Sequence, residues 1–490
     1  MLINAEQLLQ YQRCKRRPFL DVYGDKKQRD PANDLLQKLQ QDKIAHQSSI
    51  LTPLAYHQPD YSYGDWETGA AATIKFMQQG VDCIYKGVLL TTYDQKYTLL
   101  SRPDLLFKQP GNSCFGDWMY APATIELGKR PKQEYQILAA FHAQVLATVQ
   151  EVEPEVAWLM LRTKQTSYEV DLAKWTLQMR LILEEFIETL ELSAAPEVFI
   201  ARQKCNLCHW YSYCYAIAQS EKHLSLLPGV TPGRYTQLQA LDINTVESLA
   251  KTLPRELENL PGFDNEVALK LVVQAEAVAK NRPFILPYAI PTKDIIYTAP
   301  IEIYFDIEAQ PDLNLDYLLG VLVVDKEANT EKFYSFLAEN VEEEESIWRQ
   351  FLDLVWQYPD APIYHFCLYE LDTVKRLAKL YHTPYKDVAP VLNRFVDVYE
   401  DLIQSVALPI ESYALKAIAK WLGFEWRDSD ASGAKCIYWY DKWLETGDRT
   451  LLEIIQRYNE DDCRATRSVK DWLSNFFQNE SILRHRITSK

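Results

Sequence analysis

The chain has 490 residues, and at about 100 to 200 residues per domain it is expected to form several separately cored units. Hydrophobic residues make up 47% and charged residues 24%, with 15 Gly and 24 Pro, which excludes collagen-like, coiled-coil and broadly disordered chains. The net charge of -16 disfavours nonspecific adhesion to polyanions but is compatible with a nucleic-acid enzyme that uses metal-binding carboxylates. No apolar run reaches the roughly 18 to 20 residues that cross a bilayer, and the start lacks a secretory pattern, so a cytoplasmic protein without membrane contact is expected.

The first zone, residues 1–220, is predicted to be mixed α/β. Residues 82–90 and 97–107 read as two strands of a hairpin, and residues 132–149 read as a helix. Nine Cys scattered through a large chain do not suit a disulfide framework, so a metal or cluster role is considered instead. Three clustered thiols and a distant fourth are suited to clamp the ends of this zone around an iron-sulfur cluster or zinc. These thiols belong to Cys14, Cys205, Cys208 and Cys214.

The second zone, residues 221–285, contains two Leu-Pro-Gly turns, each followed by a hydrophobic residue and a helix-like segment, at 227–230 and 260–263. Gly permits a tight turn or a positive φ there. Such duplicated turns resemble helix-hairpin-helix modules, which hold nucleic-acid phosphates through turn amides. A purely structural helical domain is an equal alternative.

The third zone, residues 286–490, is predicted to begin with a linker and to continue as a mixed sheet covered by helices. Pro283, Pro287, Pro291 and Pro300 favour an extended linker because Pro neither continues a helix nor donates to a ladder. Strands followed by helices are typical of such a sheet. The predicted strands are 301–307 and 317–324, and the predicted helices are 341–357, 371–380, 413–421 and 451–473.

Acidic residues in this zone suggest a metal site. Alternation along a strand sends Asp306 and Glu308 to one face of an otherwise apolar segment, and burying such a pair is costly unless a cation neutralises it. Glu370 follows a strand-like segment at the start of a helix. Tyr458 and Asp462 are four residues apart, so they share one face of a helix.

The order of these residues resembles the DEDD superfamily of exonucleases, which has an RNase H-like fold, in its tyrosine-bearing subgroup. The resemblance covers the third zone, including the family's connecting helix at 412–424. It implies that four acids bind two Mg²⁺ or Mn²⁺ ions for phosphodiester hydrolysis, with a tyrosine that orients or deprotonates the attacking water. Orientation is preferred, because a phenol has a pKa near 10. The family motifs fall on Asp306 and Glu308, on Tyr369 and Glu370, and on Tyr458 and Asp462.

The sequence departs from the family at the second motif. Glu370 stands where Asp is usual and His365 where Asn is common, which would alter the metal geometry. Asp372 and Asp461 compete for places in the second and third motifs, and each is interpreted as a solvated helix charge. Asp397 either supports the site or caps a helix or turn, and the cap is favoured.

The cysteine layout of the first zone resembles RecB-type nucleases of the PD-(D/E)xK superfamily. Members with one N-terminal and three C-terminal cysteines carry a 4Fe-4S cluster, which is preferred here over Zn²⁺. Asp104 matches the metal-binding Asp of this family, and His46 matches its early histidine. Thr124 and Glu126 stand where an acid and a lysine are expected, and Lys129 could replace the lysine only by reaching from further along.

We therefore expect the first zone to bind nucleic acid more readily than it cleaves it, since Glu in place of Lys reverses the local charge. The three zones in order resemble a bacterial family of RecB-like nucleases. No phosphate-cradling loop of a helicase is present, so any helicase would be a separate partner. The expected phosphate contacts are Lys15, Arg16, Arg17, Lys129, Arg130 and Lys132.

The sequence predicts a metal-dependent 3' to 5' exonuclease that acts on single-stranded or processed nucleic-acid ends, with DNA repair as the expected setting. DNA and RNA stay equal alternatives as substrate. One alternative function is a nuclease active in residues 1–220. Another is an inactive nucleic-acid-binding adaptor.

Overall fold

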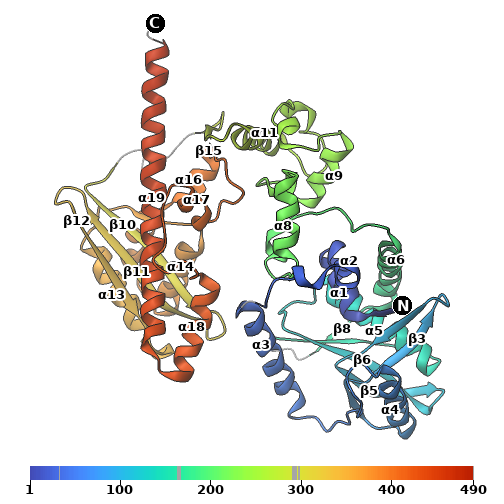
Figure 1. Cartoon of the computed structure of the whole chain (residues 1–490). Helices are drawn as coiled ribbons and strands as arrows, with labels where there is room; N and C mark the ends of the chain where they lie inside the picture. The colour runs from blue at the N-terminus through green and yellow to red at the C-terminus, as the bar shows by residue number, and fades with distance from the viewer. Residues whose placement is uncertain (33, 163–166, 290–294, 296–297, 489–490) are drawn as a thin grey trace. The chain divides into compact units, whose positions relative to one another are not determined.

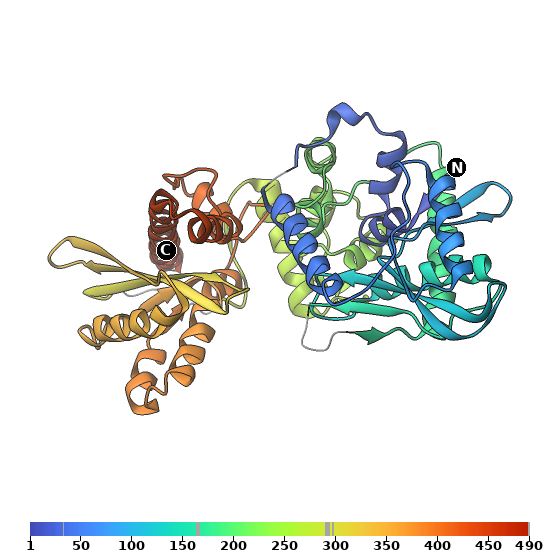
Figure 2. The same cartoon turned by 90° about the horizontal axis from the view of Figure 1, so that it is seen from below.

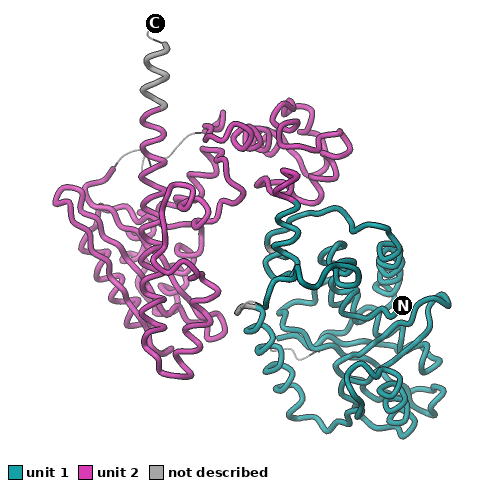
Figure 3. Tube along the Cα trace, viewed as in Figure 1, with its two compact units in different colours: residues 1–217 teal, residues 218–490 magenta. Residues whose placement is uncertain are grey.

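The computed structural model describes residues 1–32, 34–162, 167–289, 295 and 298–488. The chain divides into two compact units, unit 1 (1–217) and unit 2 (218–490), which Figure 3 shows in two colours. The further division of unit 2 near residue 285 stays a prediction. Of the linker predicted between Pro283 and Pro300, residues 290–294, 296 and 297 lie outside the described residues. Among the helices described, none has the length and apolar character needed to span a membrane.

Unit 1 contains two sheets with helices packed against them (Figure 1). The larger sheet has the order β2 (Cys83–Tyr85), β5 (Leu105–Ser113), β6 (Gly116–Glu126), β7 (Trp158–Leu161) and β8 (Tyr168–Glu169). The smaller has the order β1 (Leu2–Asn4), β4 (Tyr97–Ser101) and β3 (Leu89–Tyr93). The helices are α1 (Ala5–Arg13), α2 (Arg16–Tyr23), α3 (Asp34–Leu51), α4 (Trp66–Gln79), α5 (Gln133–Gln150), α6 (Leu172–Glu191) and α7 (Arg202–Cys205), with α8 (Tyr211–Ser220) at the end of the unit.

The helix expected at 132–149 is present as α5, but the predicted hairpin is wrong in its pairing. The expected strand 82–90 contains β2 and the start of β3, and the expected strand 97–107 contains β4 and the start of β5. β3 pairs with β4 in the smaller sheet, whereas β2 pairs with β5 in the larger one. Lys86 has a left-handed φ of 51°, which ends β2. Pro103 lies between β4 and β5, where it cannot donate to a ladder.

The two Leu-Pro-Gly turns in unit 2 have the same local structure. Gly229 and Gly262 have φ values of 91° and 84°, which L side chains rarely adopt. Each turn leads into a capped helix, α9 (Pro232–Ala240) or α11 (Asn265–Lys280). Arg234 donates to the carbonyl oxygens of both turn glycines, at 2.8 and 2.9 Å, and so ties the turns together. Phosphate binding by these turns stays a prediction.

The rest of unit 2 is built on a five-stranded sheet with helices on both faces. Figure 2 shows α18 and α19 on one face and α13 and α14 on the other. The strand order is β12 (Thr330–Leu337), β11 (Leu315–Asp325), β10 (Ile301–Gln310), β13 (Ile363–His365) and β14 (Phe395–Asp397). The helices are α13 (Glu344–Trp356), α14 (Tyr369–Leu380), α15 (Tyr385–Leu392), α16 (Val398–Ser405), α17 (Leu415–Trp421), α18 (Gly433–Thr446) and α19 (Arg449–Thr488). Elsewhere in the unit lie α10 (Val246–Leu249) and a strand pair, β9 (Phe284–Ile285) with β15 (Val406–Ala407).

Strand β10 is central, antiparallel to β11 and parallel to β13. Its side chains alternate as expected. Phe305 stacks on Phe351 of α13, with 4.6 Å between ring centroids. Asp306 instead accepts a hydrogen bond from Asn459 of α19. Strand β10 therefore directs Asp306 toward α19 and Phe305 toward α13.

Candidate active site

Three carboxylates meet between β10 and α19. Asp306 and Glu308 lie on β10 and Asp462 lies on α19, and one oxygen of each is within 4.8 Å of the other two. Within the described ranges, no other three His, Cys, Asp or Glu ligand atoms are grouped this closely. Carboxylate oxygens are the ligands that Mg²⁺ and Mn²⁺ prefer. The donor set therefore fits a hard divalent cation.

A fourth acid, Glu370, belongs to the same cluster. It lies in the first turn of α14, is 5% exposed, and its charge raises the pKa of both Asp306 and Glu308. Its buried Oε2 accepts no hydrogen bond in the part of the chain that the structure describes. His365 Nδ1 lies 3.6 Å from this oxygen. An orphaned carboxylate oxygen is available to a metal ion.

Burial and neighbouring acids disfavour the ionisation of this cluster when no cation is present. Burial, followed by the charges of the neighbouring acids, raises the pKa of Asp306 and Glu308 well above the usual range. Burial also raises the pKa of Asp462 to about 7, although hydrogen bonds from Trp426 and Tyr458 oppose the shift. Buried like charges are stable when a cation neutralises them.

Tyr458 lies one helical turn before Asp462 and is 8% exposed. Burial raises the pKa of its phenol far above 10, and the charges of Asp462, Glu308 and Asp306 add to the shift. Beside these acids the phenol keeps its proton and acts as a hydrogen-bond donor. This arrangement agrees with the role of orienting a water molecule.

The turn between β13 and α14 positions Glu370. Cys367 has a φ of 76°, a conformation that is strained for a residue with a side chain. Its N–H donates to Asp397 at 3.0 Å, and its carbonyl oxygen hydrogen-bonds His365 Nδ1 at 2.6 Å. Asp397 also caps α16, as the favoured interpretation of the sequence predicted. Asp397 thus stabilises the turn that places Glu370 in the cluster.

Two residues that sequence reasoning missed hold Asp306 in place. Asn459 is fully buried and donates from Nδ2 to Asp306 Oδ2 at 2.7 Å. Gly320 pairs with Asp306 across β10 and β11, and a Cβ added there would lie 1.6 Å from Asn459 Oδ1. Only glycine therefore leaves room for this asparagine. An isolated Gly in an apolar strand is the signal that could have indicated such a close approach.

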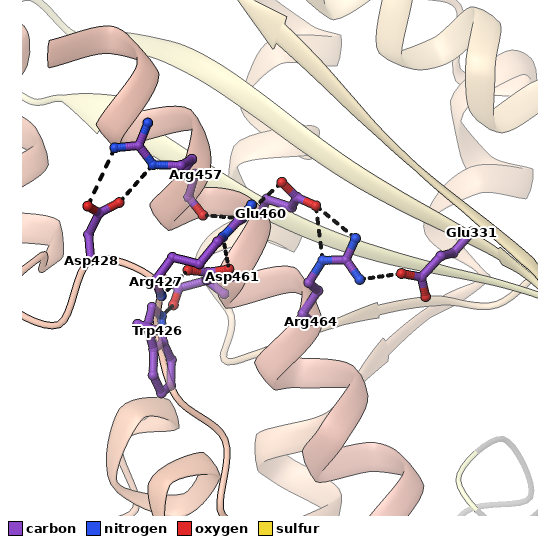
Figure 4. A network of polar contacts seen from close by, with 9 residues as sticks. Glu331, Trp426, Arg427, Asp428, Arg457, Glu460, Asp461 and Arg464 are labelled. Carbon is purple, nitrogen blue, oxygen red and sulfur yellow. Dashed lines mark hydrogen bonds and ion pairs between the residues drawn. The ribbon is translucent and has the colours of Figure 1, made fainter. Parts of the chain in front are cut away.

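Trp426 and Arg427, in the segment before α18, hydrogen-bond to α19 beside the acid cluster. Trp426 Nε1 donates to Asp462 Oδ1 at 2.8 Å in a buried contact. Arg427 donates from its backbone N–H and its Nε to the two oxygens of Asp461, at 2.9 and 2.8 Å (Figure 4). The expectation that Asp461 is a solvated charge is therefore wrong, since it is 3% exposed and ion-paired. Asp372, in contrast, has a 68% exposed side chain, as expected.

A chain of ion pairs continues along the same helix in Figure 4. Glu460 accepts from Arg427 at 2.9 Å and from Arg464 at 2.8 Å, and Arg464 also pairs with Glu331 of β12. Arg457 donates to Asp428 at 3.0 Å. These pairs fix the rotation of α19 relative to the sheet, which keeps Tyr458 and Asp462 facing β10.

Comparison with known families agrees with this geometry. Residues 303–474 match the family model described as the RNase_H superfamily. This part of the chain is an RNase H-like domain. No curated protein matches the chain. The match supports a metal-dependent enzyme that hydrolyses nucleic acid.

The four cysteines predicted as cluster ligands come together in unit 1. Burial raises the pKa of Cys205 and Cys214 to about 11 and also raises that of Cys208. The charge of the nearby Cys14 adds to the rise in all three. Asp21 of α2 links the segment after Cys14 to the segment between Cys208 and Cys214. Its carboxylate hydrogen-bonds the side chains of His209, Trp210 and Arg29 at 2.6, 2.9 and 3.1 Å.

Several basic residues expected to contact phosphate have partners within unit 1. Lys15 pairs with Glu185, Arg16 donates to the carbonyl oxygen of Pro196, and Arg17 lies 3.8 Å from Asp21. Lys129, Arg130 and Lys132 are exposed. These three residues are therefore the better candidates for phosphate contact, which stays a prediction.

Asp104 and Glu126 line one pocket of unit 1, but Lys129 and His46 do not. Both oxygens of Asp104 accept hydrogen bonds, from Gln47 at 2.9 Å and from the N–H of Ile125 at 2.7 Å. Burial raises the pKa of Asp104, and it raises that of Glu126 to about 7. Lys43 of α3 opposes both shifts, so a lysine from another element lies near these acids.

Proposed function

We propose that unit 2 is a 3' to 5' exonuclease that uses two divalent ions. The observation that supports this most is the meeting of acids from β10, α14 and α19 at one buried point, with three ligand oxygens within 4.8 Å. Polarity and the preference for single-stranded ends come from the resemblance to tyrosine-bearing DEDD exonucleases. The RNase H-like domain match supports the hydrolysis of nucleic acid.

Asp306, Glu308, Glu370 and Asp462 would hold the ions. Bound Mg²⁺ or Mn²⁺ would supply an acidified water and charge stabilisation for the departing 3' oxygen. The protein's own part is to keep the four acids in position. Asn459 hydrogen-bonds Asp306, and Trp426 hydrogen-bonds Asp462. The turn at Cys367 places Glu370 beside them.

Tyr458 would orient the attacking water by donating or accepting a single hydrogen bond. Its raised pKa makes a phenolate base unfavourable beside the acids. Lys416, whose Nζ lies 5.9 Å from the centroid of the Tyr458 ring, adds a positive charge at the edge of the site. A phosphate group can be attracted by this charge.

Unit 1 would be a RecB-like, PD-(D/E)xK-type domain that binds the nucleic-acid substrate. It would carry a 4Fe-4S cluster with Cys14, Cys205, Cys208 and Cys214 as ligands. The spacing of the four cysteines, which is that of the RecB-like family, favours this cluster over Zn²⁺. Unwinding of duplex substrate would require a separate helicase.

The direct test uses purified protein with Mn²⁺ and single strands of DNA and RNA labelled at either end. We expect nucleotides to be released one at a time from the 3' end, and Asp306→Asn to stop this release. Asp372→Asn is the matched control, because it removes an exposed acid of the same unit. Release that persists in Asp306→Asn would contradict the proposal.

The cluster has its own test. Protein purified without oxygen should contain iron and acid-labile sulfide in equal amounts, about four of each per chain for this cluster type. Cys208→Ser should lower both contents, whereas Cys114→Ser, at an exposed cysteine elsewhere in unit 1, should not. Zinc in place of iron would contradict the assignment.

A further inference from the structure

A β-bulge lies beside the acid cluster of unit 2, on the strand next to Glu308. Glu308 of β10 pairs with Leu318 of β11. The next pair is Ala309 with Asp316, so Tyr317 has no partner on β10 and is the extra residue of the bulge. A bulge changes the direction of a side chain, and bulges are frequent next to active sites. The direction in which Tyr317 points is therefore informative.

The bulge turns Tyr317 toward the face of the sheet that carries the acids. Its ring stacks on that of Tyr440 of α18, with 3.9 Å between centroids and 11° between the ring planes. Helix α18 packs on the same face of the sheet as α19 (Figure 2). Strict alternation would instead send Tyr317 to the face opposite Leu318, where α13 packs. After burial, the charge of Glu308 contributes most to raising the pKa of this phenol, which agrees with their placement on one face.

The hydroxyl of Tyr317 is buried without a hydrogen-bond partner. The residue is 0% exposed, and its Oη makes no hydrogen bond within the described part of the chain. The stacked Tyr440, in contrast, donates its hydroxyl to the carbonyl oxygen of Ala338 at 3.0 Å. An unsatisfied buried hydroxyl costs free energy, so a partner that forms in another state of the protein is expected.

Glu308 differs from the neighbouring acids in having no donor. Asp306 accepts a hydrogen bond from Asn459, and Asp462 accepts one from Trp426. Among the described residues, no hydrogen bond opposes the rise in the pKa of Glu308 that burial and the neighbouring acids cause. Carboxylates that bind a metal ion are normally oriented by hydrogen bonds from surrounding groups. The unpartnered hydroxyl and the unsupported acid are therefore complementary.

We propose that Tyr317 is a positioning residue that donates its hydroxyl to Glu308 when the acid cluster holds a divalent ion. The inference rests on the proposed function, since it requires Glu308 to be a metal ligand. With an ion bound, Glu308 stays ionised, and an anionic oxygen is a stronger acceptor than a neutral carboxyl group. The metal-bound state thus gains a hydrogen bond that the metal-free state lacks, and this bond fixes the orientation of the carboxylate.

The test compares Tyr317→Phe with Tyr440→Phe in the full chain. Calorimetry measures the affinity for the Mn²⁺ that Asp306→Asn no longer binds, and thermal unfolding measures the metal-free protein. Tyr317→Phe should weaken this Mn²⁺ binding about tenfold, as losses of groups that orient metal ligands do. Its metal-free melting temperature should stay the same or rise, because the variant loses only an unsatisfied hydroxyl. Tyr440→Phe should show the reverse, with a lower melting temperature and an Mn²⁺ affinity within twofold of the original.

A double-mutant cycle identifies the partner of the hydroxyl. In a Glu308→Gln background, Tyr317→Phe should weaken Mn²⁺ binding no further, because the anionic acceptor is gone. Full additivity of the two changes would overturn the proposal. An unchanged Mn²⁺ affinity in Tyr317→Phe would also overturn it, as would a lower metal-free melting temperature in this variant, since the hydroxyl would then support the fold. Equal Mn²⁺ binding by Asp306→Asn and the original protein would refute the metal site itself, and with it this inference.

Discussion

The acid cluster of unit 2 and the charged pocket of unit 1 both contain buried carboxylates, but their surroundings differ. In unit 2, the charges of neighbouring acids raise the pKa of Asp306 and Glu308. In unit 1, three cationic side chains share the wall with three acids. Acids crowded together are stabilised by a bound cation, whereas acids beside cationic side chains already have positive charge near them. The groups around a buried acid therefore decide how strongly its ionisation depends on a metal ion.

The largest effect is expected from Glu370→Gln, which tests whether the fourth acid belongs to the unit 2 cluster. Loss of a ligand removes several kcal/mol of charge stabilisation, so cleavage should fall about a thousandfold. Asp372→Asn, on the same helix turn but exposed, should cleave normally. Rates measured with end-labelled strands check this. Normal cleavage by Glu370→Gln would show that Glu370 is not part of the metal site and that three acids suffice.

Tyr458→Phe should reduce cleavage about a hundredfold, the lower end of the range for a group that handles the reacting water's proton or position. Metal affinity should fall much less than cleavage does, since the phenol is not a ligand and only hydrogen-bonds Asp462. Tyr385→Phe is the control, because Tyr385 is 79% exposed. A loss of Mn²⁺ affinity in Tyr458→Phe as large as the loss of cleavage, measured by calorimetry, would show that the tyrosine acts through the ligands instead.

Trp426→Phe should weaken Mn²⁺ binding in unit 2 about tenfold, because it removes the hydrogen bond that holds Asp462. Trp356→Phe is the control, since its indole donates to Asp387 at 3.2 Å on another helix. Calorimetry that finds equal Mn²⁺ affinities for both variants would contradict the positioning role.

Gly320→Ala should destabilise the protein by about 1 to 3 kcal/mol, since the new methyl group would overlap Asn459. Adding Asn459→Ala should recover part of this loss, so that the two changes are not additive. Gly233→Ala has nothing within 4 Å and should cost less. Urea unfolding measures all four variants. Strict additivity would show that Gly320 does not make room for Asn459.

The smallest effect concerns pH. Carboxyl groups whose folded-state pKa is raised stabilise the metal-free protein at low pH, and this stability is lost as pH rises through the folded pKa, about 7 for Asp462. The metal-free melting temperature should therefore fall between pH 5 and pH 8, and Mg²⁺ should raise it more at pH 8. Asp306→Asn should flatten this dependence. A Mg²⁺ effect that is equal at both pH values would contradict the cluster electrostatics.

The sequence located the acids of unit 2 because strand alternation and helical spacing are local rules, which β10 and α19 follow. It could not show the contacts made by Trp426 and Arg427, which join segments more than thirty residues apart. Strands β13 and β14 have three residues each, too few to show a period. The hairpin error in unit 1 arose because the chain turns at Lys86, which has a left-handed φ, and Gly87, inside the segment predicted as one strand.

The central claim is that the acids at 306, 308, 370 and 462 bind divalent ions together. Anomalous diffraction from crystals of the protein soaked in Mn²⁺ tests it most directly. The account predicts ion density between the carboxylates of Asp306, Glu308 and Asp462, with Glu370 in the ligand shell. Mn²⁺ density found elsewhere but absent from these carboxylates would contradict it.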